Sequence, residues 1–138
     1  MLTWATAQKE YEGFPLLLRR PTNLDVDLLR PSHPELAVVT HEFTQRLPNG
    51  LPEPDYNGTL FEMDVELVEA FDACQKGVPV LVETFGGKRH YYFYVTKDAD
   101  VPATISAVAQ RHPSERLTWT IRPDPKWGLF ERYAKAYF

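Results

Sequence analysis

The sequence predicts a single α+β domain in which helices pack on one face of an antiparallel sheet. Three patterns within its 138 residues support this fold class. Apolar residues recur at helical spacing after residue 59, two apolar runs flank Gly86-Gly87, and residues 116–122 alternate between apolar and polar side chains. A chain of this length suffices for one domain with a substantial buried core.

The first part of the chain predicts two strands and two loops. The run FPLLLRR, from Phe14 to Arg20, is short and apolar, and ELAVVTHEF, from Glu35 to Phe43, is rich in strand-forming residues. Three prolines make residues 21–34 a connection between the two strands. Three more prolines and two Asn-Gly pairs make residues 46–58 a loop.

A helix is expected to begin at Thr59, because Thr59 and Glu62 have the spacing of a capping box. An apolar stripe at spacings of three and four residues defines its buried face: Leu60, Met63, Leu67, Phe71 and Cys74. Gly77 is expected to end the helix in a left-handed conformation. Its place on the stripe makes Cys74 a small core residue that reacts slowly with thiol reagents in the native state.

Residues 78–97 predict a two-residue hairpin, because both glycines of Gly86-Gly87 can adopt a positive φ. The turn fixes the register: Glu83 lies opposite His90, Val82 opposite Tyr91, and Val80 opposite Phe93. One face of the hairpin is expected to face the core and to hold Val78, Val80, Val82, Tyr91, Phe93 and Val95. The other face is expected to hold Leu81, Glu83, Phe85, His90, Tyr92 and Tyr94.

The last part of the chain predicts a helix, a strand and a second helix. Asp100 and Pro102 open a helix whose apolar side consists of Val101, Ile105, Val108 and Ala109. In the strand that follows, the inward side chains are expected to be Leu117, Trp119 and Ile121. Asp124-Pro125 is expected to cap a final helix whose apolar side includes Trp127 and Phe130.

From residue 35 to residue 122 the predicted order of elements is βαββαβ, which is the ferredoxin-like split-βαβ pattern. The complete prediction is therefore a ferredoxin-like α+β sandwich over residues 1–138, with an extra N-terminal strand and a C-terminal helix. The second face of the sheet is expected to be covered by the final helix or by a second subunit. The final helix is favoured, because it follows the preceding strand directly and has an apolar side to bury.

Composition narrows the classes of function. The net charge of −4 and the pI of about 5.5 disfavour nucleic-acid binding, which requires a basic surface. The single cysteine excludes an internal disulfide. No signal-peptide pattern and no run of about 18 apolar residues occurs, so we expect a cytoplasmic protein without membrane association.

Five segments carry a family resemblance: Trp4, PLLLRR from Pro15, LFEMDVELVEAF from Leu60, RHYYFYV from Arg89, and DPKWGLFERY from Asp124. Together they resemble the uncharacterised bacterial family called domain of unknown function 695. That family is similar in architecture to the protein inhibitor of ribonuclease E, a small acidic regulator. The resemblance implies an α+β sandwich and favours a regulatory role, and it supplies no catalytic residues.

The sequence contains no strong enzyme, metal or cofactor motif. Its four histidines are far apart and it has one cysteine, so we expect no metal site and no cofactor. The sharpest catalytic candidate is the cross-strand pair Glu83 and His90, whose carboxylate could orient the imidazole as a general base. The alternative is that this pair is a polar contact on a half-exposed sheet.

Candidate binding residues lie on the second face of the sheet and at its margins: Arg19, Leu81, Tyr92, Tyr94 and Trp127. Three functions compete. The first is a cytoplasmic, noncatalytic regulatory or protein-binding module, with a protein partner or a second copy of the chain on its sheet face or Pro-rich loop. The second is a small hydrolase that uses Glu83 and His90. The third is an immunity or inhibitor protein against a basic nuclease, which the acidic balance permits.

Overall fold

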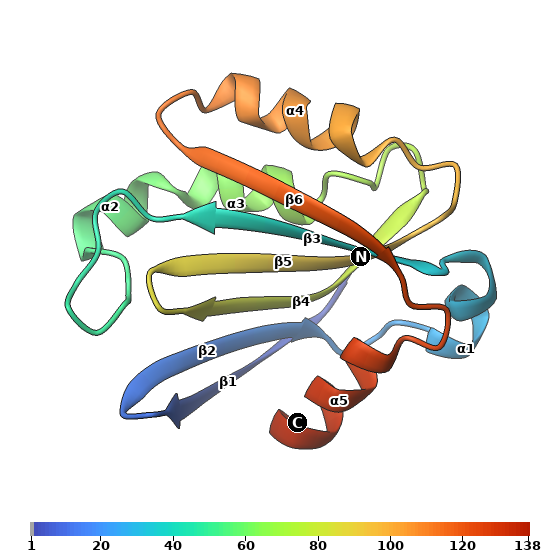
Figure 1. Cartoon of the computed structure of the whole chain (residues 1–138), viewed down its shortest axis with the longest axis horizontal. Helices are drawn as coiled ribbons and strands as arrows, with labels where there is room; N and C mark the ends of the chain where they lie inside the picture. The colour runs from blue at the N-terminus through green and yellow to red at the C-terminus, as the bar shows by residue number, and fades with distance from the viewer. Residues whose placement is uncertain (1) are drawn as a thin grey trace.

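The computed structural model describes residues 2–138 and has a mixed α+β fold built on a six-stranded antiparallel sheet (Figure 1). The strands are arranged in the order β1-β2-β4-β5-β3-β6. Their bounds are β1 Trp4–Tyr11, β2 Phe14–Pro21, β3 Glu35–Glu42, β4 Gly77–Phe85, β5 Lys88–Val95 and β6 Arg116–Pro123. All strands except β1 coincide closely with predicted strands.

Five helices and one short 3-10 helix connect these strands within the described residues. They are α1 Val26–Leu29, the 3-10 helix Arg30–Ser32, α2 Pro54–Thr59, α3 Phe61–Val68, α4 Val101–Arg111 and α5 Gly128–Tyr137. Helix α4 begins where the sequence predicts, because the side chain of Asp100 accepts the backbone N–H of Ala103 at 3.1 Å.

The sheet has a hydrophobic core on each face. Helices α3 and α4 bury their apolar sides in the first core, which includes Val39, Met63, Leu67, Val82, Tyr91, Phe93, Ile105 and Val108. Residues of α5 and the preceding turn contribute to the second core, which includes Leu18, Leu36, Leu81, Tyr92, Tyr94, Trp127 and Leu129. The prediction that the final helix covers the second face is confirmed.

The final helix begins later than predicted. Asp124 does cap it, since its carboxylate accepts the backbone N–H groups of Gly128 at 2.9 Å and Leu129 at 3.1 Å. Trp127 precedes the helix with a left-handed backbone, φ 57°, and is fully buried. On the strand before it, Ile121 pairs with Ala37 on the face of the first core, as predicted, but it is 41% exposed because β6 is an edge strand.

The hairpin of β4 and β5 has the predicted turn and most of the predicted register. Gly86 and Gly87 both have positive φ, and Glu83 pairs with His90. The prediction for Val80 is wrong, because a β-bulge between Pro79 and Leu81 leaves Val80 unpaired. The bulge also transfers Val78 and Val80 to the second core.

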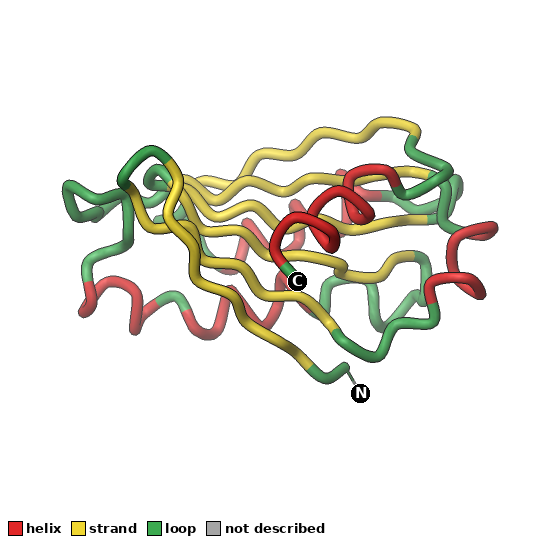
Figure 2. The backbone as a smooth tube through the Cα atoms, turned by 90° about the horizontal axis from the view of Figure 1, so that it is seen from below, coloured by secondary structure: helices red, strands yellow, loops and turns green. Residues whose placement is uncertain are grey.

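The N-terminal segment forms a strand, β1, that the sequence analysis does not predict. It pairs along its whole length with β2, and the two are joined by Glu12 and Gly13, both with positive φ. Glu is not typical of such a turn, and the polar segment lacks a clear apolar alternation. This hairpin extends the sheet and slants away from the other strands (Figure 2).

The predicted helix from Thr59 to Gly77 is wrong in its bounds. It is replaced by α2 and α3, and Thr59 ends α2, where its hydroxyl donates to the carbonyl of Tyr56 at 2.6 Å. Gly77 is the first residue of β4 and lies against Phe71, where no Cβ fits. The predicted stripe remains buried from Leu60 to Phe71 and ends there.

Cys74 is exposed, so its predicted place in the core is wrong. The cause is the end of α3 at Val68, after which the chain turns and Cys74 no longer follows the buried stripe. We therefore expect native protein to react with an aromatic disulfide reagent about as fast as the urea-unfolded protein does. Absorbance at 412 nm measures this rate, and a native rate a hundredfold below the unfolded rate would contradict the exposed position.

Candidate functional site

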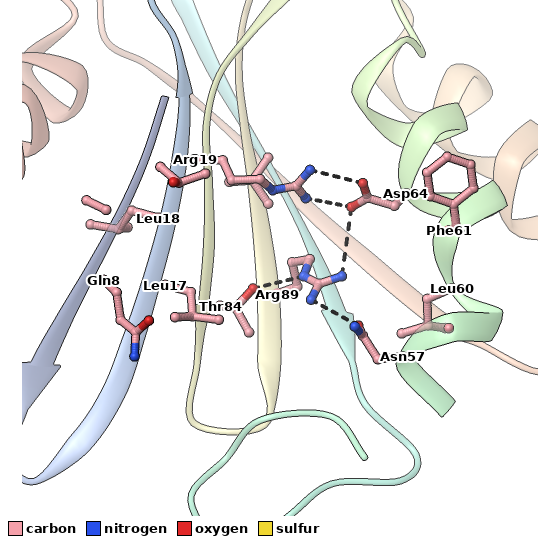
Figure 3. A pocket seen from close by; sticks show the side chains of 14 residues that line it. Gln8, Leu17, Leu18, Arg19, Asn57, Leu60, Phe61, Asp64, Thr84 and Arg89 are labelled. Atoms are coloured by element: carbon pink, nitrogen blue, oxygen red, sulfur yellow. Dashed lines mark hydrogen bonds and ion pairs between the residues drawn. The ribbon is translucent and has the colours of Figure 1, made fainter. Parts of the chain in front are cut away.

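A groove of about 520 Å³ lies between the β1–β2 hairpin and helices α2 and α3. It exists because β1 and β2 extend the sheet sideways, and α3 lies across from them on the same face (Figure 3). Its lining is formed by Thr6, Ala7, Gln8, Leu17, Leu18, Arg19, Asn57, Gly58, Leu60, Phe61, Asp64, Val82, Thr84 and Arg89. The volume is in the range of small-ligand and peptide sites.

An ion pair connects the two sides of this groove. Arg19 of β2 donates two hydrogen bonds to Asp64 of α3, at 2.7 and 3.1 Å (Figure 3). The Tyr91 hydroxyl donates a third at 2.5 Å. Burial disfavours the charge on Asp64, but the bonds and charges of Arg19, with Tyr91 and Arg89, outweigh it and lower the pKa of the carboxyl. The Asp64 carboxylate is therefore a fixed acceptor and unsuited to proton transfer at neutral pH.

A second guanidinium, that of Arg89, lies beside this ion pair and below it in the view of Figure 3. Arg89 of β5 is held by its Nε, which donates to the Thr84 hydroxyl at 2.8 Å, and its Nη2 lies 3.4 Å from the Asn57 side-chain oxygen. Its Nη1 is 3.8 Å from Asp64, which is an ion-pair distance beyond a good hydrogen bond. The side chain is 12% exposed, so most of it is fixed while part of the guanidinium faces the groove.

The remaining lining of the groove is mostly apolar, with the polar Thr6 and Gln8 on β1. Leu17 on β2 and Leu60 at the α2–α3 junction lie on opposite sides, and Phe61 stands at the rim with 74% of its surface exposed. At one end the Arg19–Asp64 ion pair bridges β2 and α3, and beyond it Trp4, on the same face of β1 as Thr6, packs against the first core. The site is thus a groove that an ion pair bounds at one end, with a largely apolar wall and a cationic floor.

A buried polar cluster holds the α2 wall in place. The Nε2 of His41 on β3 donates to Glu115 at 2.8 Å, and the Tyr56 hydroxyl of α2 donates to the same carboxylate oxygen. Burial lowers the pKa of His41 against the opposing effect of Glu115. Its Nδ1 has no hydrogen-bond partner among residues 2–138. These bonds connect α2 to the sheet and leave no free side chain for chemistry.

The predicted pair Glu83 and His90 lies on the other face of the sheet. The two residues are cross-strand neighbours, but each binds other partners. Glu83 accepts hydrogen bonds from Tyr133 at 2.6 Å and Tyr92 at 3.3 Å, while the Nδ1 of His90 lies 2.9 Å from the Thr40 hydroxyl. Burial lowers the pKa of His90, although the charge of Glu83 opposes this.

The predicted binding residues are divided between the two faces. Arg19 lies in the groove, whereas Leu81, Tyr92, Tyr94 and Trp127 are buried in the second core. Trp127 stacks on Tyr94 with ring centroids 4.3 Å apart and donates its indole N–H to the His33 carbonyl at 2.8 Å. Arg19 therefore does not converge with Glu83 and His90 in one pocket.

The main residues of the groove are absent from the sequence-based candidates, except Arg19. A signal existed for two of them, since the predicted register places Thr84 opposite Arg89. A weaker signal existed for Asp64, which lies four residues after Leu60 and three before Leu67, at the margin of the buried stripe. The sequence contains no signal that brings Asp64 to Arg19, because β1 and β2 are not predicted to extend the sheet there.

Two further features bear on the class of site. No group of three or more His, Cys, Asp or Glu side chains within residues 2–138 is arranged to hold a metal ion. In the same residues, no helix has both the length and the apolar character needed to cross a membrane.

Comparison with known proteins gives one match. A family model described as a family of unknown function, DUF695, matches residues 3–133, which is nearly the whole chain. No curated protein and no solved structure matches.

Proposed function

Because the chain belongs to the DUF695 family of unknown function, we propose its role from its own groove: it is a noncatalytic binding module that holds a segment of a protein partner between the β1–β2 hairpin and α2–α3. The notion of a binding module agrees with the sequence-based expectation, but the proposed surface differs. The expected surface was either the second sheet face, which α5 covers, or the Pro-rich loop of residues 46–58, of which only Asn57 and Gly58 line the groove.

The observation that carries this proposal is the combination, in one groove, of a partly engaged guanidinium and an exposed phenylalanine. Arg89 is held in place by Thr84 and lines the groove, and its Nη1 lies 3.8 Å from Asp64, beyond a good hydrogen bond. Phe61 is a large apolar side chain at the rim and is mostly in water. Exposed aromatic and arginine side chains around a groove are typical of protein interfaces.

Two observations favour a noncatalytic role. Asp64, the groove carboxylate, already accepts three hydrogen bonds and has a lowered pKa, so it is a poor general base. Glu83 and His90 each bind other side chains and lie on the opposite face. The hydrolase hypothesis therefore lacks a nucleophile and an accessible base.

We further propose that this module acts in the cytoplasm of a bacterium as a regulator.

The four strands β4-β5-β3-β6, with α3 and α4 on one face, support a ferredoxin-like relationship in which the β1–β2 hairpin is an addition to the edge. A role against a basic nuclease is less well supported at this groove, because its two guanidinium groups would repel a basic surface.

Site-specific photo-cross-linking tests the proposed surface. We expect a benzoylphenylalanine at position 61 to give a discrete cross-linked protein in the native host, because Phe61 lines the groove. The same group at Leu28, which is 71% exposed on α1 and away from the groove, should give none. The adducts are measured by gel shift and identified by mass spectrometry. An adduct from position 28 alone, or from neither position, would contradict the proposed surface.

A further inference from the structure

We infer that the groove recognises the C-terminus of a polypeptide, with the terminal carboxylate on Arg89 and the last side chain, an apolar one, against Leu17, Leu60 and Phe61. This inference rests on the proposed function and names the class of ligand. Three features of the groove lead to it: its charge, its closed end and its apolar wall.

The groove carries a net positive charge that one negative charge on a ligand can neutralise. Arg19 and Arg89 supply two positive charges, and Asp64 supplies one negative charge. The chain as a whole has a net charge of −4, so this positive site is local. One carboxylate neutralises this net positive charge, whereas a doubly charged phosphate would leave the site negative and would be repelled more strongly by Asp64.

Hydrogen-bond donors are available for that carboxylate. Arg19 directs two N–H groups to Asp64 at 2.7 and 3.1 Å, whereas the Nη1 of Arg89 is 3.8 Å from the same carboxylate and lacks a hydrogen bond of good geometry to it. The Asn57 side chain is exposed beside Arg89 and can add its amide N–H groups. Arginine donors fixed in advance are well suited to a planar carboxylate.

The closed end favours a chain terminus over a continuous segment. The Arg19–Asp64 ion pair spans from β2 to α3 (Figure 3). Trp4, two residues before Thr6 on the same face of β1, packs against the first core. A polypeptide that enters from the open side therefore has to stop at the guanidinium groups. A carboxylate at this end leaves the adjacent side chain beside Leu17 and Leu60, where burial of an apolar group is favourable.

The test uses a tripeptide of two alanines and a C-terminal leucine, acetylated at its N-terminus, as the free acid and as the C-terminal amide. Both are titrated into the ¹⁵N-labelled protein, with chemical shifts recorded for the amides of Gly58 and Phe61 and the Nε–H of Arg89. We expect the free acid to shift these signals and the amide to bind at least about tenfold more weakly, since a charge-assisted bond is lost.

Two variants locate the carboxylate. Arg89→Gln should weaken binding of the free acid at least about tenfold, whereas Arg132→Gln, the same change at an exposed arginine on α5, should leave it unchanged. Asn57→Asp is the second variant, because it supplies an internal carboxylate to Arg89 at an exposed position and so competes with the ligand. Asn57→Asp should weaken binding of the free acid and have little effect on binding of the amide.

The outcomes separate this inference from the proposed function. Equal affinity of acid and amide at the same signals would overturn carboxylate recognition and leave polypeptide binding in place. Shifts confined to residues outside the groove, or absent for both peptides, would also overturn it. The proposed function itself is decided by the adduct at position 61.

Discussion

Replacing Trp127 with alanine is expected to reduce the free energy of unfolding by about 4 kcal/mol, since large aromatic-to-alanine changes in a core cost about 3–5 kcal/mol. The side chain is fully buried, stacks on Tyr94 and donates to the His33 carbonyl. Its removal leaves a cavity beneath the first turn of α5 and an unpaired buried carbonyl.

Urea unfolding monitored by far-ultraviolet circular dichroism measures this loss. Trp119→Ala is the matched control, because Trp119 is only partly buried, on the edge strand β6. Trp119→Ala should reduce the free energy of unfolding by about half as much as Trp127→Ala or less, because Trp119 has a smaller buried area. Equal losses for the two variants would mean that α5 is not anchored through Trp127.

Asp64→Asn is expected to destabilise the protein by about 2 kcal/mol at neutral pH. The asparagine keeps the shape but not the charge, so Arg19 and Arg89 face each other without a carboxylate between them. Loss of one partner from a buried ion pair costs about 3–5 kcal/mol, and the figure is reduced here because Arg19 is one-third exposed. Glu62→Gln, an exposed carboxylate on the same helix, should cost only a few tenths of a kcal/mol.

The same variant should change the dependence of stability on pH. The folded-state pKa of Asp64 is lowered from its ordinary value of 3.8. The contribution of the Asp64 carboxylate to the free energy of unfolding is therefore complete above pH 3.8 and is lost as the pH falls through the lower folded-state pKa. Urea unfolding between pH 7 and pH 2 should show that the free energy of unfolding falls less steeply with decreasing pH in Asp64→Asn than in the Glu62→Gln control. Identical acid profiles would contradict the Arg19–Asp64 geometry.

Local signals explain which parts of the fold could be predicted. The positive φ angles at Gly86 and Gly87 depend on those residues alone, so the hairpin and the Glu83–His90 register follow from sequence. The bulge between Pro79 and Leu81 interrupts the alternation of side chains in the same strand, farther from the turn. Because proline donates no hydrogen bond to the ladder, it was a signal for this irregularity that the alternation rule ignores.

Long-range packing explains most of what the sequence did not reveal. Helix α2 lies in a proline-rich segment, yet Tyr56 connects it to His41 and Glu115, which are distant in sequence. The Arg19–Asp64 pair joins residues 45 positions apart. The Arg19–Asp64 pair depends on the sheet order, in which β2 lies beside β4 and the polar strand β1 lies outside β2. The groove was therefore not predictable beyond Arg19 and the Thr84–Arg89 pair.

A crystal structure of the protein with the acetylated alanine–alanine–leucine free acid would show whether Arg89 binds the terminal carboxylate. The predicted result places the terminal carboxylate within about 3 Å of the Arg89 guanidinium, a normal distance for a charge-assisted bond. The leucine side chain should lie between Leu17 and Phe61, with the peptide leaving by the open end. A peptide bound on another face, or bound in the groove with its carboxylate in solvent, would contradict the account.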